Sequence, residues 1–462
     1  DPDHSLVGSE MCIRDRSHAL WRRRASVFSD ADEASWMGWL DLPNASPEVA
    51  IGSPALREAV RSHPADTAVV IGMGGSSLWP DVLGHVFEGQ ASREQTRRLL
   101  VLDSTVPDDL LEKLAGLDLE RTLFFVSSKS GSTIEPNAIF ELVWARLVER
   151  VGHEAAGRHF VAITDPNSAL EALAQERGFL GTALGRPDVG GRFSALSPFG
   201  LLPAEAMGLD PEDLLARART MAAACAPFVA ADRNPGVRLG LALGTLARSG
   251  RDKLTLSTSP ALELFTAWIE QLVAESTGKG GLGIVPIAGE PLGAPDRYAE
   301  DRVFVDLTLA GEASDATTVE RRAKLRALEQ AGHPVIHLEI SDRRDLVQEV
   351  FRWEMATATA GAVLGLNPFD QPDVEAAKIA SRALMAEAAD GGGLPRREAN
   401  LEIDATRLFV APRLAEHASA PEDAAGWLHA LIASLEPNDT FVVNAFLPTS
   451  PAIRALLQSL RQ

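Results

Sequence analysis

The chain has little of three things that would mark it for other classes of protein. Only two cysteines, Cys12 and Cys225, occur in 462 residues, so a disulfide framework is excluded and a reducing cytoplasm is the expected location. The 44 Lys and Arg are outnumbered by 64 Asp and Glu, and the net charge of −20 argues against nucleic acid or an anionic membrane as partner. No apolar run approaches the roughly 20 residues of a membrane span. An acidic chain that binds an anion must do so in a local pocket.

The length suits two or three domains. Residues 1–16 lack the apolar stretch of a signal peptide and fit nothing after them, so we expect a non-native leader there. The chain stops inside an expected helix, which suggests a truncated C-terminus. We expect a first α/β domain over residues 17–240, a second over 241–395, and a C-terminal extension over 396–462.

Short apolar runs alternate with helical stretches from about residue 55 onward. This alternation predicts an α/β fold of two doubly wound parallel sheets with helices on both faces. In such folds ligands bind beyond the carboxyl ends of the strands. The expected strands cover residues 68–71, 99–102, 123–126 and 160–163 in the first domain and 254–257, 284–287, 303–307 and 335–338 in the second. In the tail, residues 408–410 and 440–446 are further strand candidates.

The segment at residues 127–133 has the composition of an anion site. It reads S-S-K-S-G-S-T, directly after an apolar strand and before a helix that we expect to begin near Ile134. Hydroxyls, an ammonium and the free N–H groups of a helix start are what a phosphate dianion needs in place of water. Serine and threonine also suit a helix cap, but a cap needs one hydroxyl and this segment has five. The pattern therefore favours phosphate binding.

A second Gly/Ser loop follows the first expected strand. Residues 72–77 read G-M-G-G-S-S and precede a helical stretch over 78–87. Glycines let the backbone approach a ligand closely, and serines can donate to it. The dinucleotide fingerprint G-x-G-x-x-G is incomplete, since Ser77 stands at its last position, and the chain has no P-loop. Nucleotide binding is therefore disfavoured.

Arg192 is a candidate for contact with an anion, and Lys378 is a second basic residue that lies close to a helix start. Arg192 directly follows Gly190 and Gly191, so the backbone can bend tightly and aim the guanidinium at a ligand. The alternative is a surface turn with a solvated arginine. Lys378 falls about two turns into a helix that Pro372 opens, and taken alone it would be a solvent-facing lysine.

Glu275 is the candidate general base. It stands in the last turn of a helix that we expect to begin with Ser259 as N-cap and Pro260 in its first turn. The negative end of the helix dipole makes a charged carboxylate costly there, so the group holds a proton more readily. A base that works near neutral pH needs that property. The alternative is that Lys279 simply neutralises the glutamate and Gly278 is an ordinary C-cap.

Five separated motifs occur here in the order found in the glucose-6-phosphate isomerase family. They are G-G-S-S, S-K-S-G-S-T, G-G-R-F-S, E-S-T-G-K and N-P-F-D-Q-P-x-V-E-x-x-K, within a resemblance that spans about residues 50–385. The region at 20–40 looks most like the isomerase half of bacterial proteins that fuse transaldolase to this isomerase. No transaldolase barrel is present, so the resemblance implies a fragment that lacks that half.

The resemblance implies a role for each motif. Glu275 would move the proton between C2 and C1 of the opened sugar, Arg192 would stabilise the enediolate, and Lys378 would assist ring opening. The residues that would hold the sugar phosphate are Gly75, Ser76, Ser128, Lys129, Ser130 and Thr133. The family usually places a ring-opening histidine shortly after G-E-P, but here Gly289-Glu290-Pro291 is followed by no histidine, and Arg297 or Tyr298 occupies that neighbourhood. Tyr298, Lys378, water and a histidine from a missing C-terminus are the alternatives for ring opening, and the sequence does not decide between them. His63, His85, His333 and His337 are more simply explained as structural or surface residues.

The resulting expectation is an aldose–ketose isomerase of glycolysis and gluconeogenesis. It would interconvert glucose 6-phosphate and fructose 6-phosphate through a cis-enediolate, as a homodimer and without metal or organic cofactor. The alternative is a non-catalytic regulatory module that binds sugar phosphates with the same fold. The missing histidine favours that module, whereas a pure binder has no need of Glu275, Arg192 and Lys378 together. Selectivity between glucose and mannose phosphates is left open by the sequence.

Overall fold

The computed structural model describes residues 18–89, 96–312, 316–391, 393, 398–404, 406–417, 421–436, 439–448 and 450–461. Residues up to Asp370, together with those from Pro448 onward, form one compact unit, and Gln371–Leu447 form a second. The leader expected at residues 1–16 lies outside the described residues. The domain boundaries expected near residues 240 and 395 stay predictions. Among the described helices, none is long and apolar enough to cross a bilayer.

The first sheet has five parallel strands in the order β2-β1-β3-β4-β5. Its strands are β1 (Thr67–Ile71), β2 (Arg98–Leu102), β3 (Thr122–Ser127), β4 (Phe160–Thr164) and β5 (Gly181–Leu184). The four strands expected from apolar runs are confirmed. We did not predict β5, which is short and only partly buried.

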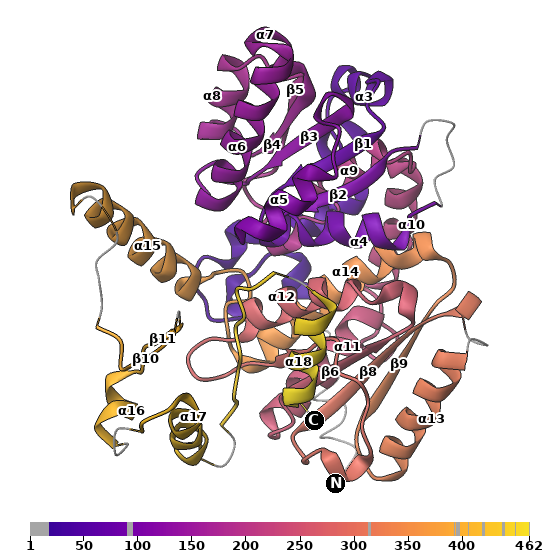
Figure 1. Ribbon diagram of the computed structural model, residues 1–462. Helices are drawn as coiled ribbons and strands as arrows, with labels where there is room; N and C mark the ends of the chain where they lie inside the picture. Colours follow the sequence, from indigo (N-terminus) through magenta and orange to yellow (C-terminus); the bar gives the residue numbers. More distant parts are fainter. Residues whose placement is uncertain are drawn as a thin grey trace. The chain divides into compact units, whose positions relative to one another are not determined.

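Helices cover both faces of this sheet because successive side chains of a strand point to opposite faces. Val69 and Ile71 of β1 pack in one apolar cluster with side chains of the helices on that face, whereas Ala68 and Val70 pack in the other cluster. The helices of this region are α3 (Pro54–Ser62), α4 (Leu78–Val86), α5 (Pro107–Ala115), α6 (Ile134–Val151), α8 (Ala169–Glu176) and α9 (Pro198–Ala206), with the short α2 (Pro47–Ala50) and α7 (His153–Ala156) (Figure 1).

The second sheet has four parallel strands in the order β7-β6-β8-β9. They are β6 (Lys253–Thr258), β7 (Val285–Ile287), β8 (Arg302–Leu309) and β9 (Val335–Ile340), and all four were expected. The helices around them are α10 (Pro211–Ala224), α11 (Pro235–Arg248), α12 (Phe265–Thr277), α13 (Ala316–Gln330) and α14 (Leu346–Leu364). In Figure 1, α11, α12 and α14 lie between the two sheets and α13 lies on the outer side of the second. The expected α/β fold with two parallel sheets is confirmed.

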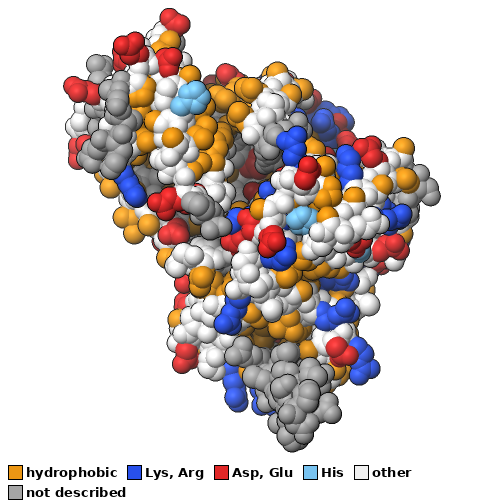
Figure 2. Space-filling view, turned by 90° about the horizontal axis from the view of Figure 1, so that it is seen from below, with side chains coloured by type: hydrophobic (Ala, Val, Ile, Leu, Met, Phe, Trp, Pro, Cys, Tyr) orange, Lys and Arg blue, Asp and Glu red, His pale blue; other side chains and the backbone are white. Residues whose placement is uncertain are grey.

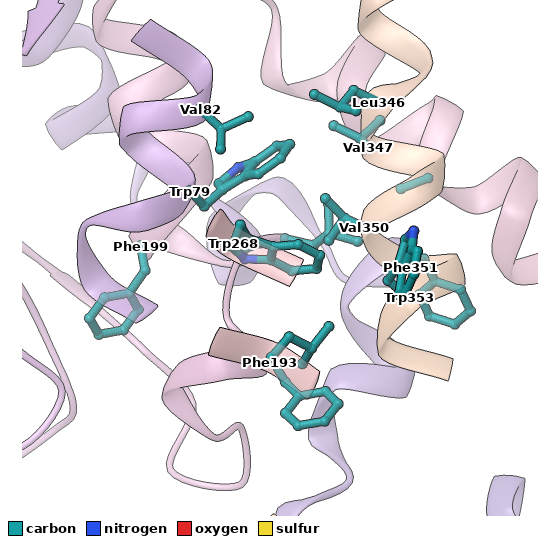
Figure 3. Packing of buried hydrophobic residues seen from close by; sticks show 14 of the residues in the cluster. Trp79, Val82, Phe193, Phe199, Trp268, Leu346, Val347, Val350, Phe351 and Trp353 are labelled. Atoms are coloured by element: carbon teal, nitrogen blue, oxygen red, sulfur yellow. The ribbon is translucent and has the colours of Figure 1, made fainter. Parts of the chain in front are cut away.

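A core of large apolar side chains joins α4, α12 and α14. Trp79 of α4 and Trp268 of α12 meet edge to face with ring centroids 6.1 Å apart, and both are almost fully buried. Val347 and Val350 of α14 lie close to them (Figure 3). This packing holds α12, the helix that carries Glu275, against the first sheet's α4.

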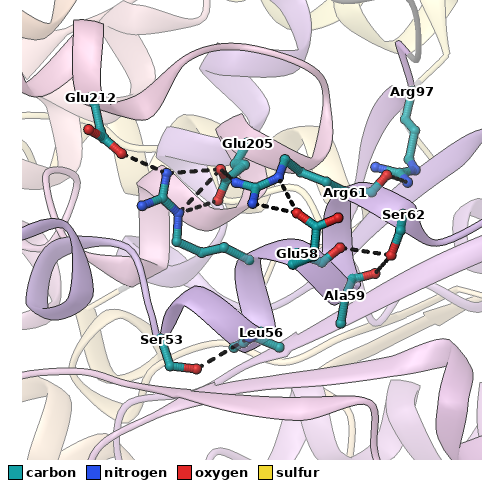
Figure 4. Close-up of polar contacts among 10 residues, drawn as sticks. Ser53, Leu56, Glu58, Ala59, Arg61, Ser62, Arg97, Glu205 and Glu212 are labelled. Atoms are coloured by element: carbon teal, nitrogen blue, oxygen red, sulfur yellow. Dashed lines mark hydrogen bonds and ion pairs between the residues drawn. The ribbon is translucent and has the colours of Figure 1, made fainter.

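A buried ion-pair network ties α3 to α9. The Glu205 carboxylate accepts hydrogen bonds from Arg57 Nε at 2.9 Å and from Arg61 Nη1 at 2.8 Å, and Arg57 also reaches Glu212 at 3.1 Å (Figure 4). The hydrogen bond to Glu205 is the largest cause of the raised pKa of Arg57. Glu205 is 1% exposed, so its charge depends on these two arginines.

The second unit has little core of its own. It contains α15 (Pro372–Gly391), the antiparallel pair β10 (Leu401–Ile403) and β11 (Thr406–Leu408), α16 (Pro412–His417) and α17 (Ala424–Ala433). The helix expected to open at Pro372 is confirmed, while residues 440–446, a strand candidate, form no strand. The last helix, α18 (Pro451–Arg461), belongs to the first unit, where Gln458 donates to the Gly289 carbonyl at 2.8 Å.

Candidate active site

The loop after β1 lies backbone to backbone against the loop that carries Arg192. A Cβ at position 75 would lie 2.2 Å from the Gly191 carbonyl oxygen, so only glycine allows this approach. Ser76, in the turn η4 (Gly74–Ser76), is mostly buried. The contact therefore places the first Gly/Ser loop directly beside the turn η7 (Gly191–Phe193).

The loop after β3 leaves the start of α6 uncapped. Thr133 occupies the N-cap position but makes no capping hydrogen bond, and its hydroxyl instead accepts from Ser128 Oγ at 3.2 Å. Ser130 and Ser132 share a 2.9 Å hydrogen bond at the surface. Gly131 has a φ of +67°, which suits glycine in this tight loop. Capping therefore does not explain the hydroxyls, and the first N–H groups of α6 have no side-chain cap.

Lys129 has a partner that the sequence did not indicate. Its ammonium forms an ion pair with Asp165, the residue after β4, and donates to the Arg186 carbonyl at 3.3 Å. Burial raises the pKa of Asp165, and the nearby ammonium acts in the opposite direction. Lys129 thus connects the loop after β3, to which it belongs, with the loops after β4 and β5. Its role in phosphate binding stays a prediction.

Arg192 and Glu275 are in direct contact. Arg192 Nη1 lies 2.5 Å from Glu275 Oε1, and the two side chains are 5% and 19% exposed. Burial lowers the pKa of Arg192, while the charge of Glu275 raises it. The alternative of a solvated surface arginine does not hold, because the guanidinium is buried. Glu275 stands in the last turn of α12, as expected.

The sequence reasoning missed Gln271. Its amide Nε2 donates to Glu275 Oε2 at 3.2 Å, and a Cβ at position 74 would lie 2.6 Å from the same nitrogen. Gln271 therefore lies between the carboxylate and the first Gly/Ser loop. The sequence feature that could have identified Gln271 is its spacing to Glu275, since residues four apart lie on the same face of a helix.

Lys279 does not neutralise Glu275 by direct contact. Its ammonium donates to the carbonyls of Asn367 and Asp370 and pairs with the Asp370 carboxylate. Ser259, which we expected to cap the helix through its hydroxyl, instead accepts from the Leu309 N–H at 3.0 Å. A short turn, η8 (Pro260–Leu262), separates Ser259 from α12, so this part of the expectation was wrong.

The groups considered for ring opening are engaged elsewhere. Tyr298 Oη accepts from the Gly293 N–H at 2.9 Å, and its ring packs edge to face on Phe304. His63 is a half-buried histidine whose pKa is lowered to about 4, first by burial and then by His159. Lys378 lies on α15 in the second unit and pairs with Glu375 at 2.9 Å. Its role in ring opening stays a prediction.

Residues from all five motifs are thus close neighbours within the first unit, the fifth motif through residues 367–370, which Lys279 contacts. The loop at 72–77 contacts Gly191, Arg192 contacts Glu275, and Ser127 lies against Gly72, where a Cβ would be 3.2 Å from the Ser127 carbonyl oxygen. Both Gly/Ser loops follow the carboxyl ends of the adjacent strands β1 and β3, where ligands bind in doubly wound folds. The arrangement combines uncapped N–H groups and hydroxyls with a carboxylate and a buried cation.

The fold and this site define a sugar-isomerase type of α/β protein. The family model described as phosphoglucose isomerase matches residues 61–283. A glucose-6-phosphate isomerase from Bacillus cytotoxicus is 31% identical over 83% of this chain and 92% of its own length. One from Rubrobacter xylanophilus is 34% identical over 79% of this chain and 92% of its own. A crystal structure of a hypothetical protein from Thermus thermophilus covers 83% of this chain and 97% of its own at a TM-score of 0.70 and 27% identity. The chain belongs to the glucose-6-phosphate isomerase family.

Proposed function

We propose that this protein interconverts glucose 6-phosphate and fructose 6-phosphate by proton transfer through a cis-enediolate. The contact between Arg192 and Glu275 carries the proposal. When Glu275 takes the proton from C2 it becomes neutral, and the negative charge moves to the enediolate. Arg192 therefore faces one negative charge before and after the transfer, in a buried site where such stabilisation is strong.

The loops at 72–77 and 127–133 supply the phosphate end of the proposed site. The N–H groups at the start of α6 and the hydroxyls of Ser128, Ser130 and Thr133 suit a dianion. Gly75 and Ser76 would hold the sugar against the Arg192 turn, and Gln271 would orient Glu275. Lys129 and Lys378 have the roles that the family resemblance implies for them. No step of the proposed chemistry requires a metal or organic cofactor.

Three finer points belong to the same proposal. The similarity of residues 20–40 to fused proteins suggests the isomerase half of a transaldolase–isomerase fusion. The cysteine usage suggests the cytoplasm. A homodimer is suggested by the family, and the second unit exposes apolar side chains that a partner would cover, among them Ile379, Met385, Phe409 and Phe446. Analytical ultracentrifugation of the purified chain measures whether it is a monomer or a dimer.

The decisive experiment measures turnover of fructose 6-phosphate, with glucose 6-phosphate formation coupled to an NADP-linked dehydrogenase. We expect Glu275→Gln to lower kcat by at least about 10³-fold, because it removes the general base, and to leave the affinity for 6-phosphogluconate within about threefold. The matched control is Glu270→Gln on the exposed side of the same helix, which should keep wild-type turnover.

Two results would contradict the proposal. Most of the activity surviving in Glu275→Gln would exclude this residue as the base. Tight binding of 6-phosphogluconate by a folded wild-type chain that shows no turnover would instead favour a regulatory sugar-phosphate-binding module.

A further inference from the structure

Two buried cations beside Glu275 hold one short turn of the chain. Arg192 Nη2 donates to the carbonyl oxygens of Pro368 and Asp370, each at 3.1 Å. Lys279 Nζ donates to the carbonyl of Asn367 and, at 2.9 Å, to that of Asp370. The turn at residues 367–370 is therefore bound through its backbone by the candidate catalytic arginine and by a second cation.

The turn is also fixed by its own side chains. Asn367 Oδ1 accepts from the N–H of Phe369 at 3.0 Å, which closes the turn. The Phe369 ring packs edge to face on Phe193, the neighbour of Arg192, at 5.2 Å, and on Phe28 at 5.4 Å. The turn and the Arg192 loop are therefore packed directly against each other through Phe369 and Phe193.

The charges around the turn form two pairs. Arg192 pairs with Glu275, and Lys279 pairs with the Asp370 carboxylate. Asp370 also acts on Arg192 through its charge, since it is one of the groups that raise the pKa of Arg192. Burial lowers the pKa of Lys279, so this ammonium is kept charged by its partners in the turn. If Lys279 were absent, the Asp370 carboxylate would still act on the buried Arg192 through its charge, with no paired ammonium to offset it.

We propose that Lys279 is a positioning residue for the isomerisation. By occupying the Asp370 carboxylate and the carbonyls of the turn, it keeps the Arg192 guanidinium directed at Glu275 and at the charge that develops on the substrate. This inference rests on the proposed function. Lys279 acts through Arg192 and has no contact with the loops assigned to the phosphate, so its loss should affect kcat and not KM.

The test is a double-mutant cycle on Lys279 and Asp370. We expect Lys279→Met to lower kcat by about 10- to 100-fold with KM for fructose 6-phosphate within about threefold. Adding Asp370→Asn should restore kcat by at least about fivefold, because the competing carboxylate is gone. Lys279→Arg keeps the positive charge, and its kcat should stay within about threefold of the wild-type value. The matched control is Lys253→Met, which removes another mostly buried ammonium, paired with Asp252 at 2.9 Å, from the second sheet.

A second measurement separates this inference from the proposed function, because it needs no turnover. A five-carbon sugar-phosphate hydroxamate, whose planar anion mimics the enediolate, should bind Lys279→Met about tenfold more weakly than wild type. Binding of 6-phosphogluconate should be unchanged. Thermal unfolding of each variant shows whether it is folded, and Lys279→Arg provides a test should Lys279→Met fail to fold.

The inference is overturned if Lys279→Met has the wild-type kcat and the wild-type affinity for the hydroxamate. It is likewise overturned if kcat falls equally in Lys279→Met and in the double variant that adds Asp370→Asn. It is also overturned if Lys279→Arg is folded and as defective as Lys279→Met. Wild-type protein that binds the hydroxamate but does not turn over would contradict the proposed function alone.

Discussion

The residue-level contact between Gly75 and Gly191 leaves no room for a side chain. A Cβ at position 75 would lie 2.2 Å from the Gly191 carbonyl oxygen, so Gly75→Ala must push the two loops apart. We expect a loss of about 10²-fold in kcat/KM, since a displacement of about 1 Å in an active site has that effect. Unfolding should become easier by about 1–3 kcal/mol. The coupled assay and thermal unfolding measure the two effects.

Gly190→Ala is the control for this substitution, because a Cβ there would have its nearest neighbour at 4.0 Å. Wild-type kinetics in Gly75→Ala would mean that the loops tolerate separation and that their contact does not position Arg192.

Single residues also show where sequence reasoning stops. The motif spacing picked out Arg192 and Glu275, and the structure brings them into contact. The partner of Lys129 was not predictable, because Asp165 lies 36 residues away and meets it only through the order of the strands. The spacing of Gln271 to Glu275 places both side chains on the same face of the helix. A single glutamine belongs to no motif, however, so the sequence alone offered no reason to choose it.

At the level of elements, the sequence predicts best where burial is complete. The runs that became β1, β3 and β4 are buried along almost their whole length, so an uninterrupted apolar pattern was available. β5 reads G-T-A-L and is partly exposed, which gives no such pattern. Residues 440–446 are mostly apolar but form no strand, because a strand also needs a neighbour that the local sequence does not specify.

The ion-pair network between α3 and α9 provides a stability test. We expect Arg57→Met to destabilise the protein by about 2–4 kcal/mol, because the buried Glu205 carboxylate then keeps only Arg61. Urea unfolding measures the change. Arg121→Met, which removes the solvent-exposed pair with Asp66, should leave the unfolding midpoint unchanged. If the two substitutions lowered the free energy of unfolding equally, the burial of Glu205 would not add to the contribution of its ion pairs to stability.

Helix α14 carries a carboxyl whose titration should be visible in stability. Burial raises the pKa of Glu349 from 4.5 to about 7, against the opposing charge of Arg352. A carboxyl with a raised folded-state pKa stabilises the fold below its unfolded pKa, and this contribution is lost as the pH rises through 7. Between pH 5 and pH 8 the wild type should therefore lose about 2.5 kcal/mol of its free energy of unfolding relative to Glu349→Gln.

Urea unfolding at the two pH values checks this expectation, with the exposed Glu112→Gln on α5 as a control that should follow the wild type. A Glu349→Gln variant with the same pH dependence as the wild type would contradict it.

At the scale of the whole molecule, almost all of the buried hydrophobic side chains belong to the first unit, whereas Lys378 belongs to the second. Beyond Phe369, Trp427 is the one buried hydrophobic among the described residues. A chain that ends at Asp370 lacks the second unit and also α18 of the first unit, which has no buried residue among those described. It should therefore still unfold cooperatively and bind 6-phosphogluconate. It should lose turnover by at least about 10²-fold, because Lys378 is absent.

Lys378→Met in the full chain is the matched variant and should lose turnover to a similar degree. Full activity in the shortened chain would remove Lys378 from the mechanism. Failure of the shortened chain to fold would show that residues beyond Asp370 complete the core.

The backbone contact between the loops at 72–77 and 190–192 also constrains how this enzyme can be redesigned. The two loops meet where a Cβ at position 75 would strike the Gly191 carbonyl, and the Gln271 side chain occupies the space that a Cβ at position 74 would need. A graft from a relative with another sugar preference would have to transplant both loops and the end of α12 together. Libraries that vary one loop at a time would mostly yield loops that do not fit each other, so useful diversity lies at the exposed Ser132, whose hydroxyl is not among the proposed phosphate contacts.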